Sequence, residues 1–232
     1  MKPTMRYKEN IMANRHPRSE LLVEYTSGVL SLAPSIAVTA HLQFCGSCNN
    51  VVQSLEQLGG DLLDHSENIN VSNDLFEKVL LGIEEPNSEP EIRLGNAKNA
   101  VDEIASALPS YVRKFLPEGA LQWRFLSPSL KLATISVGET TQELALHRIK
   151  AGGKAPEHDH QGQEITVVLT GCFSDEDGLY RAGDFVVRNH GDVHRPIASQ
   201  NEECICLSVL SAPIKLTGAK RVLNPFLKFL PS

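Results

Sequence analysis

The hydrophobic pattern of this 232-residue chain changes character along its length, and this change limits the fold more than any other feature. Between residues 17 and 83, apolar side chains recur every three or four positions, as they do on one face of an α-helix. From Leu121 onward, short β-prone runs are separated by turns containing glycine or aspartate. The sequence therefore predicts two domains, a helical one followed by an all-β one.

Four helices are expected in the first half. His16-Pro17 marks the start of the first, because proline is tolerated in a first helical turn. Ala33-Pro34-Ser35 starts the second, the third begins near Ser47, and Ser72-Asn73-Asp74 caps the fourth. Their apolar stripes are, in chain order, Leu21, Tyr25, Val29 and Leu32; Ile36, Ala40 and Phe44; Val51, Val52, Leu55, Leu58 and Leu62; Leu75, Val79, Leu80 and Ile83.

An acidic segment at 84–99, which contains Pro86 and Pro90, is predicted to link the domains. It separates a helical domain at 14–83 from a second domain at 100–230. One more helix is expected at the start of that second domain, within 100–116. Six strands are then expected, at 123–125, 131–137, 144–149, 164–169, 184–188 and 204–210. Many short strands with tight turns are typical of a jelly-roll barrel.

Charge and hydropathy exclude some classes of function. The net charge of −6 argues against direct binding of nucleic acid, because neutralising phosphates requires clustered Lys and Arg. Residues 1–18 are polar and lack the apolar core of a signal peptide. The longest apolar stretch, 21–40, is interrupted by Glu24 and Pro34 and cannot span a bilayer. We expect a cytoplasmic protein that binds neither nucleic acid nor membrane.

Five cysteines fall into two close pairs, Cys45/Cys48 and Cys204/Cys206, and a single Cys172. An odd number with such short spacings, in a chain without an export signal, indicates metal ligands or reactive thiols rather than a disulfide framework. The first pair follows a histidine at helical spacing, and the second lies on a predicted strand.

His41, Cys45 and Cys48 form the first candidate metal site. On a continuous α-helix, Cys45 lies about 40° from His41 and Cys48 about 20° to the other side, so all three project from one face. One imidazole and two thiolates are ligands that Zn²⁺ favours in a tetrahedral site. His16 is expected to supply the fourth ligand, with His65 as the alternative. The competing interpretation is that these are ordinary core side chains.

The pattern His41-x-x-x-Cys45-x-x-Cys48, with His16 upstream, resembles the zinc-binding anti-sigma domain over about residues 14–83. The resemblance implies four helices that hold zinc through these four residues. It also implies that the domain binds a group IV (extracytoplasmic-function, ECF) sigma factor and lodges between its two domains, so that core RNA polymerase cannot engage it.

A second pattern, Gly152-x5-His158-x-His160-x3-Glu164-x6-Gly171, matches the first motif of the cupin family at every fixed position. His158, His160 and Glu164 share parity, so on one strand their side chains point to the same side. The match predicts that they face the inside of a barrel.

The second cupin segment begins at Gly183 and contains Gly191-x2-His194, which supplies a third histidine. It departs from the family pattern at Asn189, where proline is usual, and at Ala198, where asparagine is common. These changes affect a turn and a supporting contact, whereas the ligand itself is present.

Three histidines and one glutamate can hold zinc or another divalent transition metal, and ligand type does not choose between them. The expected ligands are His158, His160, Glu164 and His194. The competing interpretation is that the first two histidines are polar residues of a surface turn. His190 and His147 are not expected to be ligands. No additional acid/base pair for turnover is evident, so no catalytic residue is predicted.

Cys204 and Cys206 also share parity on a predicted strand, so both thiols are expected inside the barrel if that face is inward. Core packing is one interpretation of the pair. The other is a redox or electrophile sensor, which would act through metal exchange or modification, since an i, i+2 disulfide on one strand would be strained.

A zinc-binding anti-sigma domain joined to a C-terminal cupin-like domain resembles the ChrR-type anti-sigma factors over nearly the whole chain. The resemblance implies a second metal, also expected to be zinc, in a cupin domain that governs release of the sigma factor under stress such as singlet oxygen or organic peroxides. We therefore predict a regulator rather than an enzyme. Two alternatives are a cupin dioxygenase or isomerase with a dimerising helical domain, and a zinc-stabilised interaction module with an inert barrel.

Overall fold

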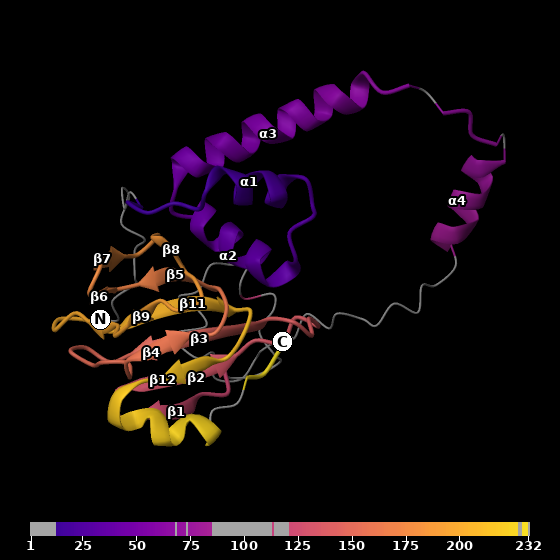
Figure 1. Ribbon diagram of the computed structural model, residues 1–232. Coiled ribbons are helices and arrows are strands. Elements are labelled where there is room, and N and C mark those ends of the chain that lie inside the picture. The colour runs from indigo at the N-terminus through magenta and orange to yellow at the C-terminus, as the bar shows by residue number, and fades with distance from the viewer. Residues whose placement is uncertain are drawn as a thin grey trace, which may run out of the picture.

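The computed structural model describes residues 13–67, 69–72, 74–84, 113, 121–226 and 229–231. Within these ranges, helices precede a set of antiparallel β-sheets (Figure 1). This arrangement confirms the predicted fold class, a helical domain followed by a cupin barrel. The predicted linker at 84–99 and the helix expected within 100–116 lie outside the described residues, apart from Glu84 and Arg113.

The helices are α1 Ser19–Thr26, α2 Leu32–Leu42, α3 Gly46–Asp64 and α4 Leu75–Glu84. The first is shorter than its apolar stripe predicted. It ends just before Gly28, whose φ of 73° is left-handed and closes the helix. Val29 is therefore 75% exposed in the connection, and Leu32 belongs to α2. Phe44, expected in the second helix, lies beyond its end.

The largest sheet has six strands, in the order β1-β2-β3-β11-β5-β8. All neighbours in it are antiparallel. Its strands are β1 Arg124–Ser127, β2 Leu130–Thr134, β3 Glu143–Ile149, β11 Cys204–Leu210, β5 Glu164–Thr170 and β8 Phe185–Arg188. These are the six strands expected from the sequence, with bounds shifted by a few residues.

Two smaller sheets complete the barrel, and the sequence did not predict their strands. One has the order β10-β6-β7, and the other β12-β4-β9. Their strands are β10 Ile197–Ala198, β6 Cys172–Asp175, β7 Gly178–Arg181, β12 Ile214–Leu216, β4 His158–His160 and β9 Val193–His194. A 3₁₀ helix, η1, follows at Gly218–Phe226.

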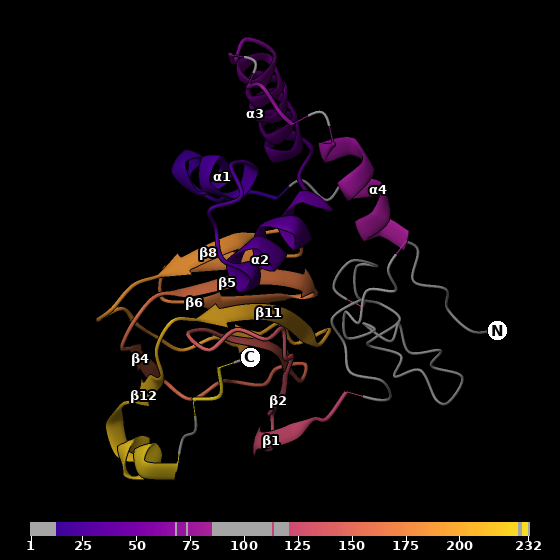
Figure 2. The same cartoon turned by 90° about the vertical axis from the view of Figure 1, so that its right-hand side faces the viewer.

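The helices and the outer face of the large sheet share one hydrophobic core. Strand side chains such as Val167 and Leu207 pack under α2, whereas Val168 and Cys206 face a second core inside the barrel. The helix lies across β5 and β11 (Figure 2). Its core-facing side chains are at most 1% exposed: Ala33, Ile36, Ala37, Val38, Ala40 and His41. The base of the helical domain is thus built onto the barrel.

Glu139, in the loop between β2 and β3, fixes the start of α2. Its Oε1 accepts hydrogen bonds from the backbone N–H groups of Leu32 and Ala33, the latter at 3.1 Å. A carboxylate at this position satisfies N–H groups that lack partners within the helix and interacts favourably with the helix dipole. The barrel therefore caps a helix that carries one of the candidate zinc ligands.

Replacing Glu139 by alanine is expected to lower the local stability of α2 by about 1 kcal/mol, since both N–H groups lose a charged acceptor. Amide hydrogens of residues 36–40 should then exchange about fivefold faster. Glu157→Ala is the control, because Glu157 pairs with Arg195 on the barrel surface. Unchanged exchange in the Glu139 variant would show that the cap does not stabilise the helix.

The outer parts of the helical domain are exposed. Along α3, only Cys48 and Val52 are buried, and the helix extends away from the barrel (Figure 1). Among the described residues, no helix has the length and apolar character needed to cross a bilayer.

Two candidate metal centres

His16, His41, Cys45 and Cys48 come together where α2 meets α3. One donor atom from each lies within 4.8 Å of the others. Nδ1 of His16 is 3.3 Å from Sγ of Cys45 and 3.4 Å from Sγ of Cys48. A nitrogen and a sulfur ligand of tetrahedral zinc lie roughly 3.5 Å apart, so this spacing suits the ion.

The convergence does not come from a single helical face, and that expectation is wrong. His41 lies in the last turn of α2, and Cys48 in the first turn of α3. Between them, Cys45 is the N-cap of α3, with an extended backbone at φ −117° and ψ 98°. Its Sγ accepts a hydrogen bond from the N–H of Cys48 at 3.4 Å. A tight corner between two helices therefore gathers the ligands.

His41 is held in a ring orientation that suits metal binding. Its Nδ1 donates to the carbonyl oxygen of Gly183 at 2.6 Å. Its Nε2 is buried and has no hydrogen-bond partner among the described residues. Burial lowers the pKa of His41, which keeps the ring neutral. A buried, neutral and otherwise unpartnered nitrogen in this cluster is what a metal ligand requires.

The two thiols differ in acidity. Burial raises the pKa of Cys48 to about 12, and its hydrogen bond with Cys45 and the charge of that thiol add to the effect. Burial opposes ionisation of Cys45 as well, but hydrogen bonds from Ser47 and Cys48 outweigh it and lower the pKa of Cys45. Cys45 therefore ionises before Cys48, and its charge disfavours ionisation of Cys48. A dication between the sulfurs offsets that repulsion, so the donors fit zinc.

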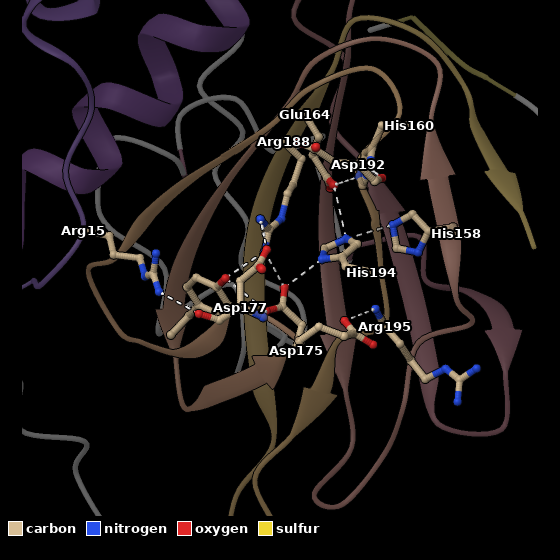
Figure 3. Close-up of polar contacts among 12 residues, drawn as sticks. Arg15, His158, His160, Glu164, Asp175, Asp177, Arg188, Asp192, His194 and Arg195 are labelled. Carbon is tan, nitrogen blue, oxygen red and sulfur yellow. Dashed lines mark hydrogen bonds and ion pairs between the residues drawn. The ribbon is translucent and has the colours of Figure 1, made fainter.

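His158, His160, Glu164 and His194 form the second cluster, inside the barrel (Figure 3). All four are at most 7% exposed. Nε2 of His158 is 3.2 Å from Nε2 of His194, and Nε2 of His160 is 2.6 Å from Oε2 of Glu164. Ligands of one transition metal are separated by about 3 Å, so these atoms can surround a single ion.

The cupin ligands come from two walls of the barrel, not from one strand as their shared parity suggested. His158 and His160 are on β4, in a small sheet, and β4 pairs with β9 so that His158 lies opposite His194. After a turn at 161–163, Glu164 begins β5 in the large sheet. The ligand set therefore ties the two walls together.

Each histidine of this cluster donates from Nδ1 to an oxygen outside it. The acceptors for His158, His160 and His194, in that order, are Pro156 O at 2.9 Å, Asp192 O at 2.7 Å and Asp175 Oδ2 at 2.9 Å. Such outer hydrogen bonds fix the tautomer and ring orientation of metal-binding histidines. They leave all three Nε2 atoms directed into the cluster.

The protonation of the cluster also fits a cation. Burial lowers the pKa of His158 to about 4. Burial opposes ionisation of Glu164, yet its hydrogen bond with His160 and the surrounding histidines keep the pKa of Glu164 well below its usual range. The same hydrogen bond overcomes the effect of burial and raises the pKa of His160. The hydrogen bond between His160 and Glu164 thus joins two of the atoms that would surround a metal ion.

Cys204 and Cys206 lie on β11 and face the inside of the barrel, with their Sγ atoms 3.6 Å apart. They are 0% and 4% exposed. The hydrogen bond with Cys204, together with burial, raises the pKa of Cys206. Cys206 is therefore disfavoured as a thiolate, and a redox-sensing role for the pair stays a prediction.

Three other histidines lie apart from the clusters. His65 caps the far end of α3, is exposed, and donates to the carbonyl of Asp61. The structure therefore does not bring this alternative fourth ligand to the first centre. His190 is exposed in the turn after β8, and His147 on β3 lies 3.3 Å from Oγ of Ser208.

Two aspartates that hold the ligands in place were not predicted from the sequence. Asp175 accepts the hydrogen bond from His194, and Asp184 accepts hydrogen bonds from the backbone of Asn14 and Arg15 beside His16. Both belong to acidic turns, and the sequence indicates only that a turn is present, not which residues the aspartates contact. The signal available was a cluster of aspartates between glycines, which is common in any β-hairpin.

Comparison with known proteins agrees with this architecture. A family profile described as the ChrR cupin-like domain matches residues 114–212. The anti-sigma-E factor ChrR of Cereibacter sphaeroides is 29% identical over 219 residues, which is 94% of this chain and 100% of that protein. The crystal structure of Rhodobacter sphaeroides SigE in complex with the anti-sigma ChrR matches with a TM-score of 0.67 and 26% identity. It covers 86% of this chain and 99% of the matched chain.

The family match covers most of the barrel, and the alignment with the relative also includes the helices and the His–Cys cluster. Both parts of the chain therefore point to the same group of proteins. The predicted resemblance to the ChrR-type anti-sigma factors is confirmed, and residues 114–212 match the family model of the ChrR cupin-like domain.

Proposed function

We propose that this chain is an anti-sigma factor, which binds an ECF (group IV) sigma factor and keeps it from core RNA polymerase. The observation that carries the proposal is its similarity, along 94% of its length, to a relative named as an anti-sigma factor. The solved structure that matches with a TM-score of 0.67 is a complex of such a factor with SigE. The chain is then a regulator rather than an enzyme, and it acts in the cytoplasm, where transcription takes place.

An apolar surface on the helical domain supports this role. Six side chains of α4 are between 41% and 72% exposed: Leu75, Phe76, Val79, Leu80, Leu81 and Ile83. On α3, Leu58, Leu62 and Leu63 are between 54% and 74% exposed. A groove of about 390 Å³ lies at the start of α4. Exposed apolar side chains gathered on one helix in this way mark a protein-binding site, so a sigma factor is expected to cover them.

Zinc is the expected ion of the first centre, because two thiolates and two imidazoles suit it in a closed tetrahedral site. The ion would fix the corner between α2 and α3. Since α3 has only two buried side chains, both near this corner, its direction depends on the geometry there. The metal would thereby set how the apolar faces of α3 and α4 are presented to the sigma factor.

The cupin domain is expected to sense stress of the singlet-oxygen or organic-peroxide type and to trigger release. Its buried histidines and carboxylate can hold zinc or another divalent transition metal. The thiols of Cys204 and Cys206 lie in the same barrel. Oxidation of the metal ligands or of the thiols would alter the metal cluster. It would thereby shift the population toward a form with lower affinity for the sigma factor.

Transcription in vitro tests the proposal. The zinc-loaded chain is added to core RNA polymerase with each group IV sigma factor of the same genome, and separately with the housekeeping sigma factor. We expect stoichiometric inhibition with one ECF sigma factor, recovery of that pair as a complex, and no inhibition of the housekeeping holoenzyme. Failure to bind any of the ECF factors, or steady turnover of a small substrate instead, would overturn the proposal.

A further inference from the structure

One segment of the barrel, from the end of β6 to the end of β8, contacts both metal centres. On the cupin side, the fully buried side chain of Asp175 accepts a hydrogen bond from His194. The same oxygen accepts a hydrogen bond from Arg188 at 2.7 Å, and the other oxygen accepts one from the hydroxyl of Tyr180 at 3.0 Å. The carboxylate therefore fixes the ring of a metal ligand while being fixed itself.

Tyr180 connects this hydrogen-bond network to the opposite side of the segment. Its ring is 0% exposed, and its hydroxyl also accepts a hydrogen bond from Arg188 at 2.7 Å. The guanidinium of Arg15 lies over the ring, 4.5 Å from its centre. It also donates to the carbonyl of Asp177 (Figure 3). A residue of the N-terminal segment thus rests on a side chain that contacts Asp175.

Arg15 precedes His16, the candidate zinc ligand, and the turn between β7 and β8 holds its backbone. Oδ1 of Asp184 accepts hydrogen bonds from the N–H groups of Asn14 at 2.6 Å and of Arg15 at 3.1 Å. The N–H of Phe185 donates to the carbonyl of Arg15 at 3.0 Å. His16 therefore cannot move far from the first centre unless these contacts break.

The second zinc-site histidine is tied to the same turn. Gly183 accepts the hydrogen bond from His41, and its φ of 93° is a conformation that favours glycine. A Cβ at this position would lie 2.7 Å from Cβ of Phe44, so the turn also packs closely against the corner between α2 and α3. Both histidines of the zinc centre are thus supported by residues 183–185.

We propose that residues 175–188 are a shared support that couples the two metal centres. Asp175, Tyr180, Arg188 and Arg15 act in it as positioning residues. A metal ion in the cupin centre fixes the ring of His194. That ring in turn positions Asp175 and the hydrogen-bond network that ends at Arg15, beside His16. Loss of the cupin metal therefore weakens metal binding at the thiolate centre. As a route for releasing the sigma factor, this link rests on the proposed function, whereas the coupling itself does not.

The test uses cobalt in the full-length chain, because the charge-transfer absorption of Co²⁺ bound to thiolates reports the first centre alone. His160→Ala removes a cupin ligand, and Glu164→Gln weakens the same centre while keeping the shape of the side chain. We expect either variant to lower the Co²⁺ affinity of the thiolate centre about fivefold. The charge-transfer band itself should be retained at saturating Co²⁺.

Combining these changes with Arg15→Met isolates the link, because methionine keeps most of the apolar stem and removes the guanidinium. In the Arg15→Met background, His160→Ala should change the Co²⁺ affinity less than twofold, since the connection is already broken. In the matched Glu139→Ala background the fivefold effect should persist, because Glu139 joins helix and barrel at a different place.

Two results would overturn the link. One is an affinity change of less than twofold in both His160→Ala and Glu164→Gln. The other is an equal effect of His160→Ala with and without Arg15. Neither measurement involves a sigma factor, so a coupled chain that binds no sigma factor would refute the proposed function and leave the link standing.

Discussion

A chain in which Cys45 and Cys48 are both replaced by serine is expected to lose one bound zinc and to bind its sigma factor at least about 100-fold more weakly. Serine hydroxyls are poor zinc ligands, so the corner between α2 and α3 would lose the ion proposed to fix it. Both thiols are at most 6% exposed and lie within 3.4 Å of the nitrogen of His16. Among the described residues, no other cysteine belongs to this cluster.

Metal content by mass spectrometry and sigma-factor affinity by titration calorimetry measure the two losses together. Cys172→Ser is the matched control, because Cys172 lies half-buried at the start of β6 and belongs to neither cluster. The control should retain both metals and full affinity. If the double variant lacks zinc yet binds the sigma factor as tightly as the native chain, the zinc centre does not set the docking surface.

The sequence predicted the large sheet well and the small sheets not at all. Strands such as β5 and β11 are seven residues long and rich in β-branched residues or leucine, so their pattern is unmistakable. In contrast, β4 is three residues long and reads His-Asp-His, and β9 has two residues. Such strands exist because their neighbours supply the hydrogen bonds, which is information that local sequence does not contain.

The first ligand set shows how a correct grouping can rest on the wrong geometry. A spacing of four and then three residues places side chains on one face of a continuous helix, but here the helix breaks at residues 43–45. The ligands still meet because Cys45 caps the next helix and turns its sulfur toward Cys48. Spacing restricts which residues can approach one another, whereas the backbone path between them depends on packing against Gly183.

The residues that support the ligands could not be predicted from the sequence for a different reason. Asp175 and His194 are 19 residues apart, and Asp184 and Asn14 are 170 apart. Nothing in either local pattern indicates its partner, because an aspartate in a hairpin turn is ordinary turn chemistry. Only the closed barrel, with the N-terminal segment laid against β8, brings these groups together.

Replacing Phe76 and Leu80 together by glutamine is expected to weaken sigma-factor binding at least about tenfold without loss of either metal. These side chains, four residues apart on one face of α4, are 72% and 45% exposed, so they contribute little to the folded free chain. Glutamine preserves helix propensity and adds no charge, which leaves lost apolar contact as the cause of weaker binding.

Val222→Gln is the control. Val222 is 70% exposed on η1, away from the helices, and its replacement should leave affinity unchanged. Equal affinities in all three proteins, measured by calorimetry, would mean that the sigma factor contacts the chain elsewhere. An equal loss in the control would instead mean that general surface hydrophobicity, and not the face of α4, drives the association.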